Sequence, residues 1–427
     1  MKTILKVLKR TYRKVLQSIA FYPVVIAILS IFLAVIAVKL DSSEIIQTLK
    51  EKIPFLLIED YETARSMLST FIGGILSLTV FSFTMVMVVL NQASSNFSPR
   101  LLPGLISNKR HQLILAFYIG TLLYCTIVLI SLGAYGIETS ALGLSTMLAA
   151  FSSLICIGLF VYFIHSISNA IHIHNIIDGI YEHCKYYLSK ELEKDQGSKV
   201  GLQLVDTEGW IILNAPKTGY FRGFDPDLMN DDLKDKNNQI EILPYLNQHI
   251  WQGSPVIKVR ENLTDAEKEN LIFCLTISSD RHESDKGIGG MIKLMEIAVK
   301  AMSPGINDPG TAIDAVTKLG GLLALFMQFP KLSSEPYEQE NLIIIKNHVP
   351  AKELMRVLIQ PIRLYAKHDS TVMYELVNAL TFISKHQNLS QEDVDAVLLE
   401  LKAIEDGVER NFDNEYDKKV LLKLFDK

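Results

Sequence analysis

Cysteine is scarce in this chain, with 4 residues in 427, and no pair of cysteines has the spacing of a CxxC motif. Cys125 and Cys156 fall within apolar segments, where a thiol serves as a small apolar side chain. Three histidines come close together in sequence, but helical spacing turns His174 away from His165 and His172. We therefore expect neither structural disulfides nor a metal site.

The sequence also lacks the fingerprints of nucleotide chemistry and of nucleophilic catalysis. A glycine-rich turn runs from Gly287 to Gly290, but no Walker spacing or complete Rossmann fingerprint surrounds it. No serine or cysteine has a basic partner in an elbow motif, and helix capping together with pairing to Lys293 and Lys300 accounts for the nearby acids. We expect no catalytic residue, no cofactor and no enzymatic activity. Because no basic patch with interleaved aromatics is present, nucleic acid is not an expected partner.

Apolar residues, by contrast, are abundant and unevenly distributed. Hydrophobic residues make up 49% of the chain and charged residues 21%, and the mean hydropathy is +0.22. These values are too apolar for an ordinary soluble protein and too charged for one wholly embedded in lipid. Segments long enough to cross about 30 Å of hydrocarbon are Phe21 to Leu40, Ala64 to Leu90, Leu113 to Gly136, and Ala141 to His165. We therefore expect a multi-pass membrane protein with a large soluble part.

The distribution of charge around these segments predicts an orientation. Lysines and arginines without acids precede the first span and recur between the second and third, whereas acids dominate residues 41–62. By the positive-inside rule, both termini should lie in the cytoplasm, with the spans in the bilayer of the inner membrane. No A-x-A cleavage site follows the basic start, so the first span is expected to be retained.

Composition and periodicity divide the chain into five regions. Residues 1–20 form a basic amphipathic segment, 21–165 the four-span transmembrane domain, and 166–198 a helical connector that continues the fourth span. Short β-rich runs separated by turn residues predict a small β-barrel or half-barrel over 199–261, and cap signals predict a helical subdomain over 262–427. The expected fold is a membrane α-helical domain joined to a cytoplasmic α+β domain.

Local sequence signals in the soluble part predict structural roles for particular residues. Thr264 with Glu267 predicts a capping box at the start of a helix, and Pro361 predicts a kink in a later one. Trp210 and Trp251 both lie in the β-rich region, where packing in the core is the expected role of a large aromatic side chain.

The second span carries a polar stripe in a segment nearly free of charge. Between Ala64 and Pro99 there is no Asp, Glu or Lys, and one Arg. Steps of three and four residues place nine side chains on one helix face, namely Ser66, Thr70, Gly73, Ser77, Phe81, Thr84, Val88, Asn91 and Ser95. In hydrocarbon such a stripe must face protein or water. Packing between helices and lining of a pore both remain open.

The pore interpretation predicts a homo-oligomer in which the second span of each subunit surrounds the axis and inorganic ions pass. Phe81 and Val88 would constrict the lumen, the acidic residues of 41–62 would give a weak preference for cations, and the cytoplasmic domain would gate the pore. The spans contain no central carboxylate and no repeat, which disfavours a secondary transporter. The alternative is a non-conducting sensor or scaffold whose cytoplasmic domain binds a ligand or partner.

One short motif in the soluble part is a candidate for ligand binding or gating, comprising Ser303, Pro304, Gly305, Asn307, Asp308 and Pro309. The proline and glycine at 304–305 end one helix, and the Asp-Pro pair at 308–309 begins the next. A structural role explains the motif, and an anion or ligand site at the exposed helix start is the other interpretation.

Several motifs together resemble a family of bacterial membrane proteins, domain-of-unknown-function family 2254. Those motifs are Asn96-Phe-Ser-Pro-Arg100, Gly219-Tyr-Phe, Gln252-Gly-Ser-Pro-Val256, Glu283-Ser-Asp-Lys-Gly-Ile-Gly-Gly, Leu294-Met-Glu-Ile-Ala and Ala301-Met-Ser-Pro-Gly-Ile-Asn-Asp-Pro-Gly-Thr-Ala312. The resemblance covers nearly the whole chain, with one departure at Gly310, where a larger residue fits the pattern. It implies the membrane architecture and supplies no chemistry.

Overall fold

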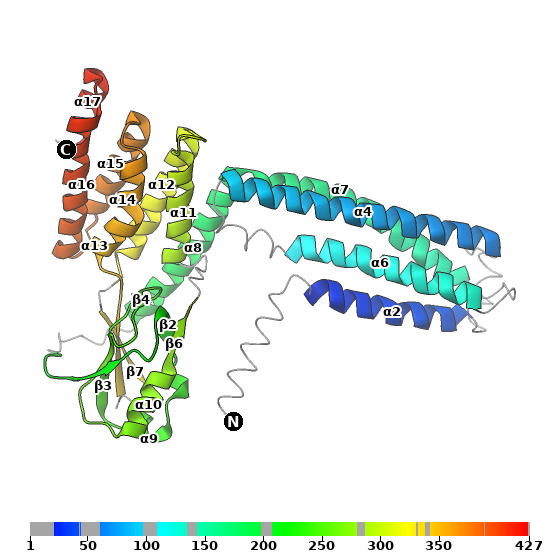
Figure 1. Cartoon of the computed structure of the whole chain (residues 1–427), viewed down its shortest axis with the longest axis horizontal. Helices are drawn as coiled ribbons and strands as arrows, with labels where there is room; N and C mark the ends of the chain where they lie inside the picture. The colour runs from blue at the N-terminus through cyan, green and yellow to red at the C-terminus, as the bar shows by residue number, and fades with distance from the viewer. Residues whose placement is uncertain are drawn as a thin grey trace. The chain divides into compact units, whose positions relative to one another are not determined.

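The computed structural model describes residues 21–41, 43, 60–96, 109–134, 143–197, 207–279, 287–329, 332–337, 342–387 and 389–425. The chain folds into two compact units, Met1–Asn175 and Ile176–Lys427, and each is described by itself (Figure 1). The amphipathic segment predicted for residues 1–20 lies outside the described residues, as do Glu44, Glu51 and Glu59 between the first two spans.

The first unit contains four long apolar helices, as the sequence predicts. By length and composition, four helices among the described residues are able to cross a membrane. They are α2 (Phe21–Asp41), α4 (Tyr61–Asn96), α6 (Lys109–Ala134) and α7 (Gly143–Ile171). Figure 1 shows them as long rods lying side by side. Their boundaries extend the predicted spans by a few residues at most ends because each helix continues past its apolar stretch into flanking polar residues.

Helix α6 is the most enclosed of the four and packs against each of the others. Half of its most apolar window is buried, 50% against 17% for α2 and α4. Small residues bring α2 close to it: a Cβ placed at Gly120 of α6 would lie 2.5 Å from Oγ of Ser30 on α2. Close approach through small residues is a common way for membrane helices to associate, because hydrocarbon offers no hydrophobic driving force between them.

The last residue of α2, Asp41, corrects an expectation from the sequence. Its place among loop acids suggests an exposed charge, yet only 1% of the residue is exposed. The carboxylate accepts hydrogen bonds from the backbone N–H of Leu144 (2.8 Å) and of Ser145 (3.1 Å), and from the Ser145 hydroxyl. Asp41 therefore caps the start of α7, whose first N–H groups have no partner within their own helix.

The α7 helix ends at Ile171, and α8 (Ile173–Gly197) begins after a break at His172. The predicted connector is therefore helical but interrupted, and no glycine or proline marks the break. Within the second unit α8 packs on the helical part: Asp178 pairs with Lys318 at 2.8 Å, and the Cys184 thiol donates to the Gly287 carbonyl at 3.2 Å. The hydrogen bond that Lys318 donates to Asp178 raises the pKa of Lys318 above its ordinary value.

The strands of the second unit form two open sheets instead of the predicted barrel. One sheet has the order β1-β5-β3-β8-β7 and the other β4-β2-β6, and neither closes on itself. The strands are β1 (Ile211–Asn214), β2 (Gly219–Phe224), β3 (Asn238–Ile242), β4 (His249–Ile250), β5 (Pro255–Val259), β6 (Leu275–Ser278), β7 (Leu332–Tyr337) and β8 (Leu342–Asn347).

The barrel prediction fails because the β-rich segment does not pair only with itself. Strand β8 follows two long helices in the sequence and lies parallel to β3, with Ile240 opposite Ile344. Strand β7 pairs with the other side of β8 and is the edge strand of the sheet. Pro336 lies on that edge strand, where a missing N–H costs no ladder bond. Strand β6 follows directly on a helix and pairs with β2.

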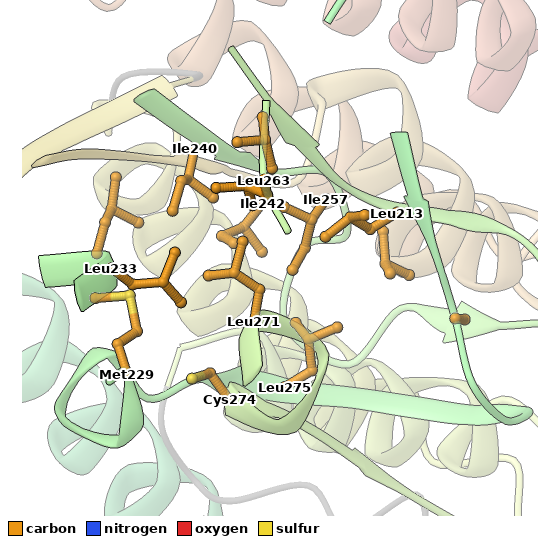
Figure 2. Packing of buried hydrophobic residues seen from close by; sticks show 14 of the residues in the cluster. Leu213, Met229, Leu233, Ile240, Ile242, Ile257, Leu263, Leu271, Cys274 and Leu275 are labelled. Atoms are coloured by element: carbon orange, nitrogen blue, oxygen red, sulfur yellow. The ribbon is translucent and has the colours of Figure 1, made fainter. Parts of the chain in front are cut away.

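The core of this β region lies between the sheets and short helices, as Figure 2 shows. Ile240, Ile242 and Ile257 project from β3 and β5 into a cluster that also takes Met229, Leu233 and Leu271. Each of these six side chains is at most 1% exposed. The short elements that contribute are η4 (Pro226–Leu228), α9 (Asp231–Lys234) and α10 (Asp265–Cys274). Helix α10 begins with the predicted capping box: Thr264 and Glu267 bind each other's backbone N–H.

The rest of the unit is helical. Its elements are α11 (Ile288–Ala301), α12 (Pro309–Phe326), α13 (Ala351–Leu354), the π-helix η5 (Met355–Ile359), α14 (Gln360–Tyr365), α15 (Ser370–Ser384), α16 (Gln391–Asn411) and α17 (Glu415–Leu422). The irregularity expected at Pro361 takes the form of the π-helix just before it, where Gln360 N–H reaches back five residues to the Met355 carbonyl.

The contact between α12 and α15 predicts different effects for two adjacent glycines. A Cβ added at Gly320 would lie 2.8 Å from Cβ of Ala379, whereas one at Gly321 would come no closer than 3.6 Å to Tyr181. We expect Gly320→Ala to lower the free energy of unfolding by about 1–3 kcal/mol through overpacking. Gly321→Ala should be neutral or stabilising by up to about 1 kcal/mol. Thermal unfolding of the two variants in detergent measures this, and equal midpoints would contradict the packing described.

The buried cap at Asp41 leads to a second prediction. Asp41→Ala leaves two amides and a hydroxyl without their acceptor and should cost about 2 kcal/mol. Asp60→Ala is a matched control because Asp60 accepts from Thr63 N–H in a similar arrangement at the exposed start of α4. Its loss should destabilise the protein less, since water replaces the exposed acceptor. Apparent melting temperatures in detergent compare them, and a similar shift for both would refute the special role of Asp41.

Candidate functional site

All nine residues of the predicted stripe lie on one exposed face of α4. The residues that α4 buries in the bundle lie on its opposite face, and they are Ala64, Leu68, Ile75, Ser82, Val89 and Ala93. At about 100° per residue the two sets point in opposing directions. Helix α4 therefore packs against α6 and α7 with one face and leaves the stripe uncovered by any described part of the chain.

Glycines in the stripe region are not approached closely by any described residue of the chain. A Cβ placed at Gly73 or at Gly74 would meet no atom within 4 Å. Glycine in a helix interior costs about 1 kcal/mol relative to alanine. Elsewhere in the bundle a glycine does permit a close approach, as Gly120 does with α2. The glycine pair of α4 thus offers a close approach that the first unit itself does not use.

The stripe hydroxyls hydrogen bond within their own helix. Thr70 donates to the Ser66 carbonyl at 2.8 Å, Ser77 to Gly73 at 2.9 Å and Thr84 to Val80 at 2.9 Å. Each hydroxyl hydrogen is therefore committed, and each oxygen keeps its lone pairs for another partner. These three hydroxyl oxygens are therefore acceptors toward the outer surface of the helix.

The two apolar stripe residues are large and partly exposed. Phe81 is 48% exposed, and its ring lies edge-on to Phe160 of α7 with 5.7 Å between centroids. Val88 is 54% exposed. The contact with Phe160 fixes the direction in which the Phe81 ring points, at the edge of the stripe nearest α7.

The motif at 303–309 forms the tight turn between α11 and α12, and its six candidate residues lie together in it. Asp308 N–H donates to the Ala301 carbonyl at 2.9 Å, which closes the turn, and Ser303 Oγ donates to Lys300 at 2.7 Å. Asn307 adopts a positive φ of 50°, which Asn tolerates better than most residues. The turn is held by its own hydrogen bonds.

Asp308 begins α12 as predicted. Its carboxylate accepts from Thr311 N–H at 3.1 Å and from the Thr311 hydroxyl at 2.6 Å, and Pro309 occupies the first turn of the helix. These bonds use the carboxylate oxygens for capping. A capping role accounts for these contacts.

A groove of about 640 Å³ lies beside the π-helix, and the sequence analysis does not anticipate it. Its wall includes Glu353, whose carboxylate accepts from Arg356 Nε at 2.7 Å and from the Tyr245 hydroxyl at 3.3 Å. Arg356 lowers the pKa of Glu353, while burial and the neighbouring Glu353 raise the pKa of Tyr245 to about 12. In the sequence, the three-residue spacing of Glu353 and Arg356 was the signal that could have predicted this ion pair. Because the charges of Glu353 and Arg356 pair with each other, we interpret this part of the groove as a structural ion pair.

The histidines near the end of α7 do not come together as a metal site. His165 interacts with the Asn169 amide at 3.0 Å, and His111 instead contacts Ser166 at 3.0 Å. No group of three potential ligands lies within reach of one ion among the residues that the structure describes.

The chain, with its four candidate spans and the 303–309 turn, is similar to known proteins. The family model for a predicted membrane protein, DUF2254, matches residues 17–381. The chain belongs to this family. Similar proteins are uncharacterized proteins of Mycobacterium tuberculosis and of Mycobacterium bovis, each 23% identical over 370 residues, covering 83% of this chain and 68% of the relative. No solved structure matches the chain. The resemblance found in the motifs is thus confirmed, and the protein is a multi-pass membrane protein.

The capping role of Asp308 can be tested directly. Asp308→Ala should lower the free energy of unfolding by about 1 kcal/mol, because Thr311 N–H loses its acceptor at the start of α12. Asp308→Asn, which retains a side-chain oxygen, should lose much less. Denaturant unfolding of the full chain in detergent measures both. A binding role would be indicated instead if neither substitution altered stability.

Proposed function

We propose that the protein forms a homo-oligomeric ion pore in the inner membrane, with the exposed stripe of α4 from each subunit facing the axis. The observation that carries the proposal is the exposure of all nine stripe residues on the face opposite the one buried in the bundle. A polar surface at this depth requires protein or water against it. A ring of copies supplies both, since neighbouring subunits cover its flanks and the lumen hydrates its centre.

The glycine pair supports contact with a second copy. Gly73 and Gly74 allow a helix to approach closely, and no described segment of the same chain does so. The adjacent lateral surface of α4 is apolar, with Leu76 52% and Met87 59% exposed, as suits lipid or a neighbouring helix. In the proposed ring the stripe faces the lumen, and these lateral residues face lipid and neighbouring subunits.

The proposed lumen has polar and apolar levels. Hydroxyl oxygens of Thr70, Ser77 and Thr84 would contact a partly hydrated ion, and Phe81 with Val88 would close the lumen by dewetting. The charge distribution favours a cytoplasmic location for both termini, and the soluble unit would then gate from that side, with the 303–309 turn as the candidate contact.

A second function is favoured by the hydrogen bonds of the stripe. Because three hydroxyls already donate to carbonyls of their own helix, the stripe does not need water. It could instead pack copies together in a non-conducting sensor or scaffold, whose soluble unit binds a ligand or partner. Both functions require an oligomer, and conduction separates them.

The test compares two tryptophan variants at one depth of α4. Ser77→Trp places an indole in the lumen and should abolish the current of the purified protein in planar bilayers. Leu76→Trp is the matched control, since its neighbouring position points about 100° away, toward lipid, and should leave the current intact. Chemical cross-linking of both variants in detergent reports whether assembly is preserved.

Each outcome has a definite meaning. An assembled wild-type protein that passes no current at any voltage would favour the scaffold and reject the pore. A current that persists unchanged in Ser77→Trp would show that the stripe does not line it. Loss of current in both variants, with assembly intact, would place the conducting path elsewhere on α4.

A further inference from the structure

An aromatic ladder lies on the surface of the three-stranded sheet. The rings of Tyr220 on β2 and His249 on β4 meet edge-to-face with centroids 5.0 Å apart, and those of His249 and Trp251 meet at 4.6 Å. Trp251 is 68% exposed, which corrects the expectation that it packs in the core. An exposed tryptophan supported by two further rings is unusual for a surface that meets only water, because a large aromatic gains most from burial.

The two sequence segments that carry the ladder contain basic residues and no acids. Residues 209–224 and 242–260 contain no Asp or Glu, although the chain as a whole carries a net charge of −5. Both segments form one continuous surface: Gln252 N–H donates to Thr218 Oγ at 3.0 Å, and Arg222 binds the Asn247 side chain. Next to these contacts lie the exposed Lys217 and Leu246, the latter 57% exposed.

We propose that this surface, defined by Lys217, Tyr220, Arg222, Leu246, His249 and Trp251, docks on the headgroup region of an anionic lipid bilayer. Amphipathic aromatic rings favour the membrane interface, where the ring meets the acyl boundary and its polar edge stays hydrated. Cations beside them bind anionic headgroups, and the two segments that carry the rings contribute no acid that would repel those headgroups. Tyrosine, tryptophan, leucine and basic residues together are the composition of interfacial segments.

The covalent structure of the chain supports lipid over other occupants. The soluble unit is joined to the last candidate span through α8, so a bilayer is always present at high effective concentration. Under such conditions weak interfacial contacts suffice for stable docking, whereas a separate protein partner would need a larger complementary surface. This proposal is independent of whether the spans conduct ions.

The chain is well suited to a fluorescence test because its two tryptophans, Trp210 and Trp251, both lie in the soluble unit. The full-length protein is reconstituted in phosphatidylcholine–phosphatidylglycerol vesicles whose acyl chains are brominated, since bromine quenches indole only at short range. Trp210→Phe leaves Trp251 as the single reporter, and its emission should fall by at least half relative to unbrominated vesicles. Trp251→Phe leaves the half-buried Trp210 as the matched control, which should lose less than a tenth.

A charge variant tests the headgroup contact. Lys217→Glu in the Trp210→Phe background should reduce quenching of Trp251 severalfold, and removal of phosphatidylglycerol should do the same. Far-ultraviolet circular dichroism verifies that each variant is folded. An unquenched Trp251 in a folded protein would overturn the proposal, as would equal quenching of both tryptophans. Efficient cross-linking of position 251 to a second copy, without lipid quenching, would assign the surface to self-association and likewise overturn it.

Discussion

Inside a bilayer a polar group has no water to bind, and this constraint governs the placement of polar side chains in the four spans. Asp41 meets it by binding the amides that begin α7, so that a carboxylate can end one helix and start another while nearly inaccessible. Thr70, Ser77 and Thr84 meet it by bonding to their own helix. The three α4 hydroxyls are thus bonded within their own helix, and α4 is free to present their oxygens on an outer surface without breaking the bundle.

One face of α4 packs in the bundle, and the opposite face carries the stripe. The buried face recurs at steps of four and seven residues, from Ala64 through Ile75 to Ala93, and this repeat holds α4 against α6 and α7. The opposite face carries glycines that no described helix approaches. Selection for bundle stability alone would favour alanine at Gly73 and Gly74, because it improves helix propensity and its Cβ would meet no described atom within 4 Å. The sequence of this face therefore fits an interaction beyond one copy of the chain.

Local chemistry was predictable from sequence, and long-range pairing was not. The spans, the Thr264 capping box and the Asp308 cap follow from patterns within a few residues, and all are present. Asp41 binds residues more than one hundred positions away, and no local pattern signals that contact. Strand β8 joins β3 across a comparable distance, which opened the expected barrel into a sheet. Trp251 was misplaced for a related reason: it lies just after β4, and its place in the β-rich region does not say whether the rest of the fold covers it.

These observations also change the physical basis of ion preference in the proposed pore. Acids of residues 41–62 act at a distance, and salt screens such a field within about 8 Å at physiological ionic strength. Asp41 contributes little to that field, because it is buried against the positive end of α7. The stripe acts at contact distance instead, where screening is weak. Its hydroxyls have given their hydrogens to backbone carbonyls, so they offer an entering ion only lone pairs. A lining of acceptors favours cations over anions even without charge, and this preference should therefore vary little with salt.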